Sequence, residues 1–479
     1  MDENTNWSLI QEKVKEKNWL FTIRFTNSSY LRVGGYNARP YSIELNIYEK
    51  VRSSKIKGFL RWWTRVLTLG QNPSLTNYKD ADEEISKYVG SEKKEFGQSK
   101  FFLDIKCEIN KKVIEEFRNK IPEIIDYITN KKKIGNEQLR DLGDVARIKL
   151  ISLERKEEKD KPEKYRKRLI EELSLYPPYS ITVTLSVYTY KSDKSDFTHI
   201  LASGLINLLG SAILMLIFSG FSAFSARGFA GCKLLDININ PKLNDIIKSD
   251  LIKNIYNIYN ICKEIINSKD KKVLEENIKK LIKSLNIKEL KSIPNIPTLD
   301  SSFKYFQFRV FEVKQNYSTE RILKIINESV MKATWKRLDR PDNKQAIKIP
   351  GEGYHTWILG LPRTQRNTGY VVFRNGEKKE AFRRKSAIGI NIFENNNKKF
   401  VILHGFISND WPVITKDKQG KELILKHLSS IHKKGEKEII EKEITKIMNV
   451  SSNSEAVNIA FDQAFRYIEM KLEEVEGGR

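Results

Sequence analysis

Apolar and polar residues follow two periods along this chain, and the two periods predict strands interleaved with helices. Alternation of apolar and polar positions, rich in β-branched and aromatic residues, predicts strands over residues 20–27, 101–109, 179–190, 232–240, 303–313, 386–394 and 399–407. Apolar residues three and four positions apart predict helices over residues 53–67, 199–219, 319–336 and 454–473. The mixture is typical of an α+β fold.

The order of these elements suggests a repeated organisation. Strand, helix, strand, strand, helix, strand in the first half is the ferredoxin-like or split βαβ order. We predict an N-terminal domain over residues 1–240 with a charged helical insertion near 111–168, a helical connector over 241–297, and a related C-terminal domain over 298–479. Prolines at positions 294 and 297 mark the second boundary.

The segment SSKIKGFLRWWTRVL at residues 53–67 carries the most information. Either of its first two serines can cap a helix. One helical face holds Ile56, Phe59, Leu60, Trp63 and Leu67. Another face holds Lys57, Arg61 and Arg65, and Trp62 lies between the two faces above Lys55. A basic ridge with an aromatic residue at its edge suits a phosphate backbone and unstacked bases. The alternative is an ordinary helix that buries its tryptophans and solvates its charges.

Composition points to a soluble protein with a polyanionic partner. Of 479 residues, 40% are hydrophobic and 30% are charged, and the formal net charge is +24. This excess favours nucleic acid ahead of an acidic membrane. The three cysteines are scattered, which argues against a disulfide framework or a zinc site and favours a reducing interior. We see no signal peptide in the first thirty residues and expect a cytoplasmic location.

One stretch raises the question of a membrane span. Residues 197–226 carry no formal charge, and the apolar part is long enough to cross a bilayer. Ser203, Asn207 and Ser211 interrupt it, and a run rich in glycine and serine follows. We therefore predict a helix buried on all sides within a domain rather than a membrane helix.

Three further segments place basic residues beside glycines or strand ends. GFSAFSARGFAG at residues 220–231 offers Arg227 and Gly228, with backbone amides that can hold phosphate oxygens. GLPRTQRNTGY at 360–370 places Arg363 and Arg366 in a predicted loop, and RRKSAIGINIF at 383–393 sets Arg383 and Arg384 before a strand. The alternatives are a plain helix-to-strand turn for the first segment and ordinary soluble surface for the others.

The sequence offers little support for catalysis. Its five histidines are isolated, none has metal-ligand spacing, and no hydrolase motif is present. His199, at the start of the apolar helix, could act as a general base, but a capping or core histidine is the simpler interpretation. We predict no cofactor, no metal site and no enzymatic activity.

These segments together resemble a known superfamily. The first strand, the GGYNAR loop at 34–39, the helix at 53–67 and the glycine-rich loop at 220–231 resemble the RAMP proteins of CRISPR systems. The start of the helix, followed by Leu-Arg-Trp-Trp and a further arginine, looks like the large subunit one of the type III-B Cmr effector complex. GLPRT and RRKSAIGINIF resemble that subunit's second half. The glycine-rich loop departs from the family, which often has a more basic loop, because Arg227 is its only basic residue.

The resemblance implies two tandem ferredoxin-like (RRM-like) domains, no catalytic site, and a place beside the 3′ region of the CRISPR RNA. The implied partners are CRISPR RNA, single-stranded target RNA and other Cmr subunits, in antiviral defence and without a membrane. Combined with the basic segments, it predicts an RNA face formed by Lys55, Lys57, Arg61, Trp62, Arg65, Arg227, Gly228, Arg363, Arg366, Arg383 and Arg384. We assign Trp63 to the core.

Two other functions remain open at this point. One is a metal-independent RAMP endoribonuclease that processes CRISPR transcripts, with His199 as the base. The other is a purely architectural subunit whose charge matches neighbouring protein and RNA.

Overall fold

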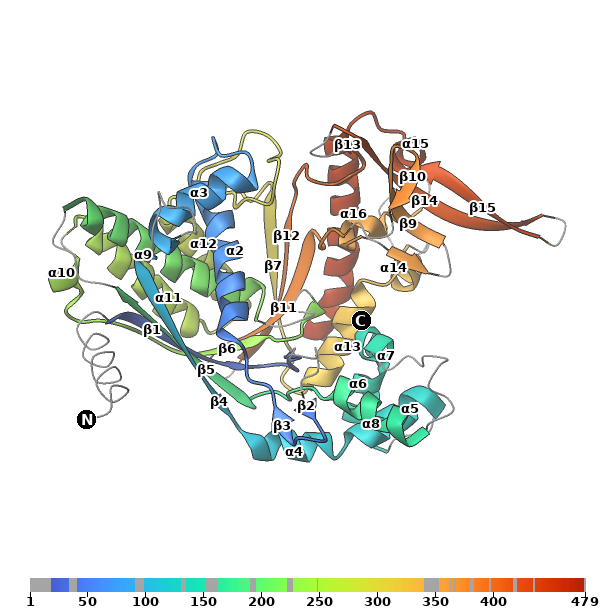
Figure 1. Cartoon of the computed structure of the whole chain (residues 1–479), viewed down its shortest axis with the longest axis horizontal. Helices are drawn as coiled ribbons and strands as arrows, with labels where there is room; N and C mark the ends of the chain where they lie inside the picture. Colours follow the sequence, from blue (N-terminus) through green and yellow to red (C-terminus); the bar gives the residue numbers. More distant parts are fainter. Residues whose placement is uncertain are drawn as a thin grey trace.

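A seven-stranded sheet runs through the centre of the molecule (Figure 1). The computed structural model describes residues 19–33, 41–90, 99–130, 135–151, 162–189, 195–221, 227–247, 249–339, 353–361, 363–365, 368–379, 383–395, 398–416, 420–433 and 436–477. The strand order of the central sheet is β4-β5-β1-β6-β11-β12-β7. Both halves of the chain therefore contribute to a single sheet.

The first half supplies four antiparallel strands of this sheet. They are β1 (Trp19–Asn27), β4 (Phe101–Ile109), β5 (Ile181–Thr189) and β6 (Cys232–Ile239). Their spatial order, β6-β1-β5-β4, is the one that the split βαβ sequence order produces. A separate short pair, β2 (Tyr41–Ser42) and β3 (Ile47–Tyr48), lies before the first long helix.

The second half adds three antiparallel strands. They are β7 (Phe306–Glu312), β11 (Ile388–Asn395) and β12 (Lys398–Phe406). Strand β11 joins the first half by parallel pairing with β6, through Phe393 opposite Cys232 and Glu394 opposite Lys233. All seven strands correspond to segments that the alternating pattern predicts.

Helices cover both faces of the sheet, so it has two cores. On one face lie α2 (Ser53–Gln71), α3 (Tyr78–Val89), α9 (Ser195–Phe218), α11 (Ile252–Ile266) and α12 (Lys271–Ser284) (Figure 1). On the other lie α13 (Thr319–Ser329) and α16 (Asn453–Leu472). Alternate residues of β12 divide between the cores: Phe400 and Ile402 join the first, and Val401 and Leu403 join the second.

Short helices complete these layers. The charged insertion contains α4 (Lys111–Arg118), α5 (Ile121–Asn130), α6 (Glu137–Asp144), α7 (Ala146–Ile151) and α8 (Pro162–Leu173). Elsewhere lie α10 (Leu243–Ile246), α14 (Lys332–Leu338), α15 (Ile444–Met448) and the 3₁₀ turns η3 (Thr356–Leu359) and η4 (Glu473–Glu476). Two of the insertion helices, α6 and α7, lie beside α13 (Figure 1).

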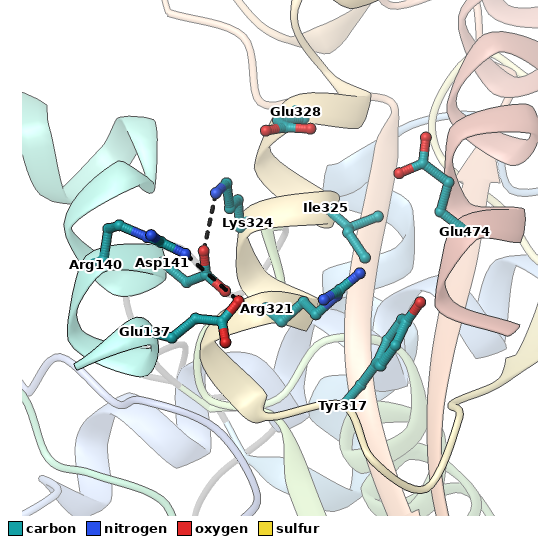
Figure 2. Close-up of a pocket in the computed structure, with 9 residues that line it drawn as sticks. All are labelled: Glu137, Arg140, Asp141, Tyr317, Arg321, Lys324, Ile325, Glu328 and Glu474. Carbon is teal, nitrogen blue, oxygen red and sulfur yellow. Dashed lines mark hydrogen bonds and ion pairs between the residues drawn. The ribbon is translucent and has the colours of Figure 1, made fainter. Parts of the chain in front are cut away.

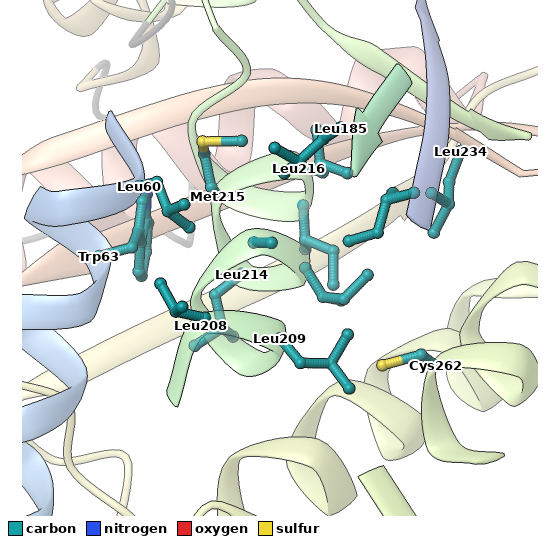
Figure 3. Packing of buried hydrophobic residues seen from close by; sticks show 14 of the residues in the cluster. Leu60, Trp63, Leu185, Leu208, Leu209, Leu214, Met215, Leu216, Leu234 and Cys262 are labelled. Atoms are coloured by element: carbon teal, nitrogen blue, oxygen red, sulfur yellow. The ribbon is translucent and has the colours of Figure 1, made fainter. Parts of the chain in front are cut away.

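Helix α9 is the segment whose composition resembles a membrane span. Of its apolar window over His199–Phe218, 89% is buried inside the molecule. Figure 3 shows why: Leu208 and Met215 of α9 face Leu60 and Trp63 of α2, and other α9 leucines point toward the strands and α11. The predicted buried core helix is confirmed.

A second sheet lies outside the predicted elements. It contains β8 (Arg363–Gln365), β9 (Thr368–Arg374), β10 (Glu377–Lys379), β13 (Ile414–Lys416), β14 (Glu422–Lys433) and β15 (Glu436–Glu443). The prediction of a loop over residues 360–370 is wrong, because β8 and the start of β9 pair there. Charge and a glycine hide the alternation in such short strands. Strands β14 and β15 project away from the body (Figure 1).

Candidate nucleic-acid interface

Helix α2 has the two faces that its sequence predicts. Ile56, Leu60 and Trp63 are buried, whereas Lys57 and Arg61 are exposed. The Trp63 indole donates a hydrogen bond to Ser219 Oγ at 2.8 Å, which confirms its place in the core. The predicted serine cap is wrong: Arg52 occupies the cap position, and no side chain caps the first turn.

Arg61 and Arg65 share one carboxylate on the neighbouring helix. Arg65 Nη2 lies 2.6 Å from Asp82 Oδ1 of α3, and Arg61 Nε lies 3.6 Å from the same oxygen. The Arg65 guanidinium also stacks over the Tyr78 ring, 5.4 Å from its centroid. The Arg65 side chain is only 19% exposed, against 45% for Arg61. The carboxylate thus orients both cations and leaves Arg61 the more accessible to a ligand.

An arginine from the second half reaches the same region. Arg384 Nη2 lies 2.8 Å from Asp410 Oδ1, and its guanidinium lies 4.7 Å above the Trp411 ring. Burial raises the pKa of Tyr78, the Asp410 carboxylate raises it further, and the Arg384 and Arg65 guanidinium groups oppose the rise. Groups from both halves therefore lie within electrostatic reach of one tyrosine. We call Arg61, Arg65, Tyr78, Asp82, Arg384 and Asp410 the arginine cluster.

The lysines at the start of α2 lie apart from this cluster. Ten residues separate Lys55 from Arg65, a distance of about 15 Å along a helix. Lys55 is half-buried, and burial lowers its pKa, with the Arg32 charge lowering it further. Lys57 is exposed. These cations extend the basic surface along α2 toward the first strand.

Trp62 occupies an intermediate position. Its ring packs edge-on against Trp63 and Phe406, with centroids 5.0 and 5.7 Å apart, and it is half-buried. Only part of its ring is open to solvent, which leaves a smaller stacking surface than the sequence suggests. Its contact with RNA stays a prediction.

Arg227 and Gly228 do not form the exposed loop that the sequence suggests. Arg227 is 4% exposed, and its guanidinium donates hydrogen bonds to the carbonyl oxygens of Leu359 at 3.2 Å and Ile388 at 3.4 Å. Gly228 is buried at φ +79°, and a Cβ there would lie 2.7 Å from Ile326 Cδ1. Arg227 and Gly228 therefore join the two halves from inside, which argues against the predicted phosphate contacts at these two residues.

The remaining predicted residues have different surroundings. Arg363, on β8, is half-buried and donates a hydrogen bond to the Val330 carbonyl at 3.0 Å. Arg383 is exposed beside Arg384. Arg366 and the GGYNAR loop at 34–39 lie outside the described residues. His199 is exposed near the start of α9. Within the described ranges, His, Cys, Asp and Glu side chains form no group of three that could hold a metal ion.

A cavity of about 440 Å³ lies between the insertion and the second half, but its charges do not suit a polyanion. Figure 2 shows Asp141 of α6 facing Lys324 of α13, whereas Arg321 points toward Tyr317. Lys324 lies 2.9 Å from Asp141, and Arg140 lies 3.5 Å from Glu137. Acidic and basic groups neutralise each other here. We therefore assign the cavity to the packing interface between α6 and α13.

Comparisons with known proteins agree with the resemblance seen in the sequence. No protein-family model matches the chain. The CRISPR system CMR subunit Cmr1 of Saccharolobus solfataricus is 26% identical over an alignment of 311 residues, and the alignment covers 54% of this chain. The chain is similar to Cmr1. The match spans 62% of the length of that relative.

Chains with a similar fold also occur in solved complexes. A chain of the type III-B Cmr-beta complex bound to cognate target RNA superimposes with a TM-score of 0.51. A chain of the same complex with target RNA and AMPPnP, in the presence of ssDNA, gives 0.53. Both are 16% identical and cover 95% of this chain, which covers 100% and 99% of theirs. The mixed α+β architecture is therefore one found in Cmr complexes.

The partners of the predicted arginines, Tyr78, Asp82 and Asp410, are not among the residues predicted from the sequence. Tyr78 and Asp82 stand four residues apart and so share one face of α3. This spacing could have indicated an arginine site, because an aromatic ring and a carboxylate on one helical face can together stack against and pair with a guanidinium group. Nothing local to Asp410 indicates that it meets Arg384.

Proposed function

We propose that the chain is an RNA-binding subunit of a type III-B CRISPR effector complex, where it holds the 3′ region of the CRISPR RNA and helps engage target RNA. The observation that carries the proposal is the arginine cluster, in which cations from both halves converge beside α2. The Cmr1 relative and the RNA-bound Cmr-beta complexes support it. Its partners are then CRISPR RNA, single-stranded target RNA and other Cmr subunits, in the cytoplasm.

The arginine cluster suits a phosphate backbone for two reasons. Guanidinium groups bind phosphate oxygens through planar, paired hydrogen bonds, and Asp82 and Asp410 hold three such groups in place before a ligand arrives. Two carboxylates against three arginines leave a net positive charge, to which exposed Arg383 and Lys385 add. Arg61, which is the more exposed of the two that share Asp82, is the first candidate for phosphate contact.

The proposal includes a tandem architecture and no catalytic role. The order β6-β1-β5-β4 supports a ferredoxin-like first unit, and β11-β12-β7 supports three strands of a second. The ribonuclease alternative is tested by incubating the pure protein with repeat RNA and a chelator. Specific cleavage that is lost in His199→Ala would overturn the non-catalytic assignment.

The first prediction concerns the arginine cluster. Replacing both Arg61 and Arg65 with Ala should weaken binding of single-stranded RNA and reduce the log–log salt slope by about 1.4, since each phosphate contact on a single strand contributes about 0.7. Fluorescence anisotropy of a labelled 30-nucleotide RNA, measured across a salt series, provides both values.

The matched control removes two exposed arginines from the insertion. Arg140→Ala with Arg166→Ala causes the same loss of charge on α6 and α8. If affinity and slope fall equally in both double variants, the effect is one of net charge, and the arginine cluster is not the RNA face. Circular dichroism confirms that both variants fold.

A further inference from the structure

A row of polar residues crosses four neighbouring strands of the second sheet. Arg363 of β8 lies opposite Tyr370 of β9, Tyr370 lies opposite His427 of β14, and His427 lies opposite Lys442 of β15. Residues directly opposite in adjacent strands share one face of a sheet. Neighbouring strands lie about 4.8 Å apart, so the row spans about 14 Å.

The row lies at the boundary between the buried part and the exposed part of this face of the second sheet. Val372 and Leu425, one step along the same face, are buried in the second core. Tyr370 is buried and donates a hydrogen bond to the Tyr354 carbonyl at 2.6 Å, whereas His427 is half-buried and Lys442 is exposed. The Tyr370 and His427 rings lie 4.8 Å apart. The aromatic pair thus connects the core to an accessible edge.

Helix α14 adds lysines to this edge. Lys332 and Lys336, one turn apart, are both exposed, and neither forms an ion pair with a carboxylate in the part of the chain that the structure describes. Burial lowers the pKa of His427, and the charges of Lys332 and Lys442 lower it further. Lys332 also lowers the pKa of buried His355, which burial brings to about 4. Arg363 donates a hydrogen bond at 3.0 Å to the carbonyl of Val330, two residues before α14, so the start of this helix, with Lys332, lies near the row.

One acidic residue of the hairpin faces away from this row. Glu441 is adjacent to Lys442 and so points to the opposite face, where it lies 3.1 Å from Lys426. We call Lys332, Lys336, Arg363, His427 and Lys442 the basic corner. It is connected to the arginine cluster, because the backbone of Leu361, two residues before Arg363, pairs with Arg384.

We propose that the basic corner is a second contact surface for single-stranded RNA, which extends the path from the arginine cluster toward the β14–β15 hairpin. The lysines and Arg363 contact phosphates, and the half-buried His427 imidazole, backed by Tyr370, offers a surface for a base. An aromatic pair among the cations, of which the His427 ring is half-buried, favours RNA over an acidic protein segment. This inference rests on the proposed RNA-binding function.

The test compares two double variants of the full chain. Lys332→Gln with Lys336→Gln removes two cations from the basic corner, and Lys253→Gln with Lys272→Gln removes two exposed lysines from α11 and α12. Binding of a labelled, mixed-sequence 30-nucleotide RNA is measured across a salt series. We expect the basic-corner variant to bind roughly tenfold more weakly and to lose about 1.4 from the salt slope, with the control unchanged.

The outcomes separate this inference from the proposed function. Wild-type protein that fails to bind RNA overturns both. If wild type binds and the Arg61/Arg65 variant weakens binding, but the basic-corner variant matches its control, only this inference fails. Unchanged RNA binding with lost binding to polyglutamate would assign the basic corner to an acidic protein instead. Cross-links from a thiouridine-containing RNA to β14 or α14 peptides would support the path directly.

Discussion

At the scale of single residues, arginine has two different roles in this protein, one near the surface and one in the interior. Arg384 is held by one carboxylate at the cluster, whereas Arg227 satisfies backbone carbonyls deep between the halves. Burying a guanidinium is costly unless its donors find acceptors, and Leu359 and Ile388 provide them. Gly228 beside it is required by a positive φ and by the nearness of Ile326. Both residues therefore position the two halves.

Gly228 and Gly376 both have a positive φ but differ in packing, so replacing each with alanine distinguishes the cost of backbone strain from the cost of overpacking. We expect Gly228→Ala to lower the free energy of unfolding by about 2–4 kcal/mol, because it combines a left-handed backbone with overpacking against Ile326. Gly376→Ala has a similar φ of +82° but open space around its Cβ, and should cost only about 1 kcal/mol. Urea unfolding measures both. Equal losses would show that packing at Gly228 contributes nothing.

At the scale of elements, strand β12 shows how one segment serves two cores. Its alternate residues divide between the layers, and His404 falls on the α9 side among Trp63 and Phe218. A Cβ on Gly389 of β11 would lie 2.3 Å from the His404 ring. The imidazole thus fills the space that a glycine leaves on the neighbouring strand.

Stability should depend on pH through this histidine. Burial lowers the pKa of His404 to about 3, below its ordinary value of 6.5, so the unfolded chain binds the proton first as pH falls. The stability it contributes is complete above about pH 6.5 and declines from there toward pH 3, by about 1.4 kcal/mol per pH unit. Urea unfolding of wild type and His404→Leu at pH 7 and pH 5 checks this. Identical pH dependence in the two proteins would contradict it.

At the scale of the whole molecule, the two halves meet in one sheet through a short junction. Strand β11 pairs with β6 over two positions, and Lys233 lies 2.8 Å from Glu394 there. The Tyr179 hydroxyl also donates a hydrogen bond to Glu394, whose side chain is 6% exposed. Asn391 adds hydrogen bonds to the carbonyls of Leu216 and Ile217 at the end of α9. Buried polar contacts therefore fix the register between the halves and, with it, the arginine cluster.

Removing the charge at this junction should be costly. Glu394→Gln leaves Lys233 without its carboxylate partner in a mostly buried site, and we expect a loss of about 2–4 kcal/mol in the free energy of unfolding. Exposed Glu276→Gln on α12 should change it by less than about 0.5 kcal/mol. Thermal and urea unfolding compare the two. A small loss for Glu394→Gln would mean that the junction depends on apolar packing alone.

The sequence by itself determined the elements of the central sheet, the buried helix α9, the division of α2 into two faces and the place of Trp63. These follow from local periodicity, which the backbone geometry of helices and strands imposes on neighbouring residues. Tertiary structure alone decided that Arg227 is buried, that Arg65 and Arg61 share Asp82, and that Arg384 joins them from the second half. It also decided that Arg363, Tyr370, His427 and Lys442 form one row. Such partners are distant in the chain, so strand pairing and layer packing bring them together, and no local pattern encodes that choice.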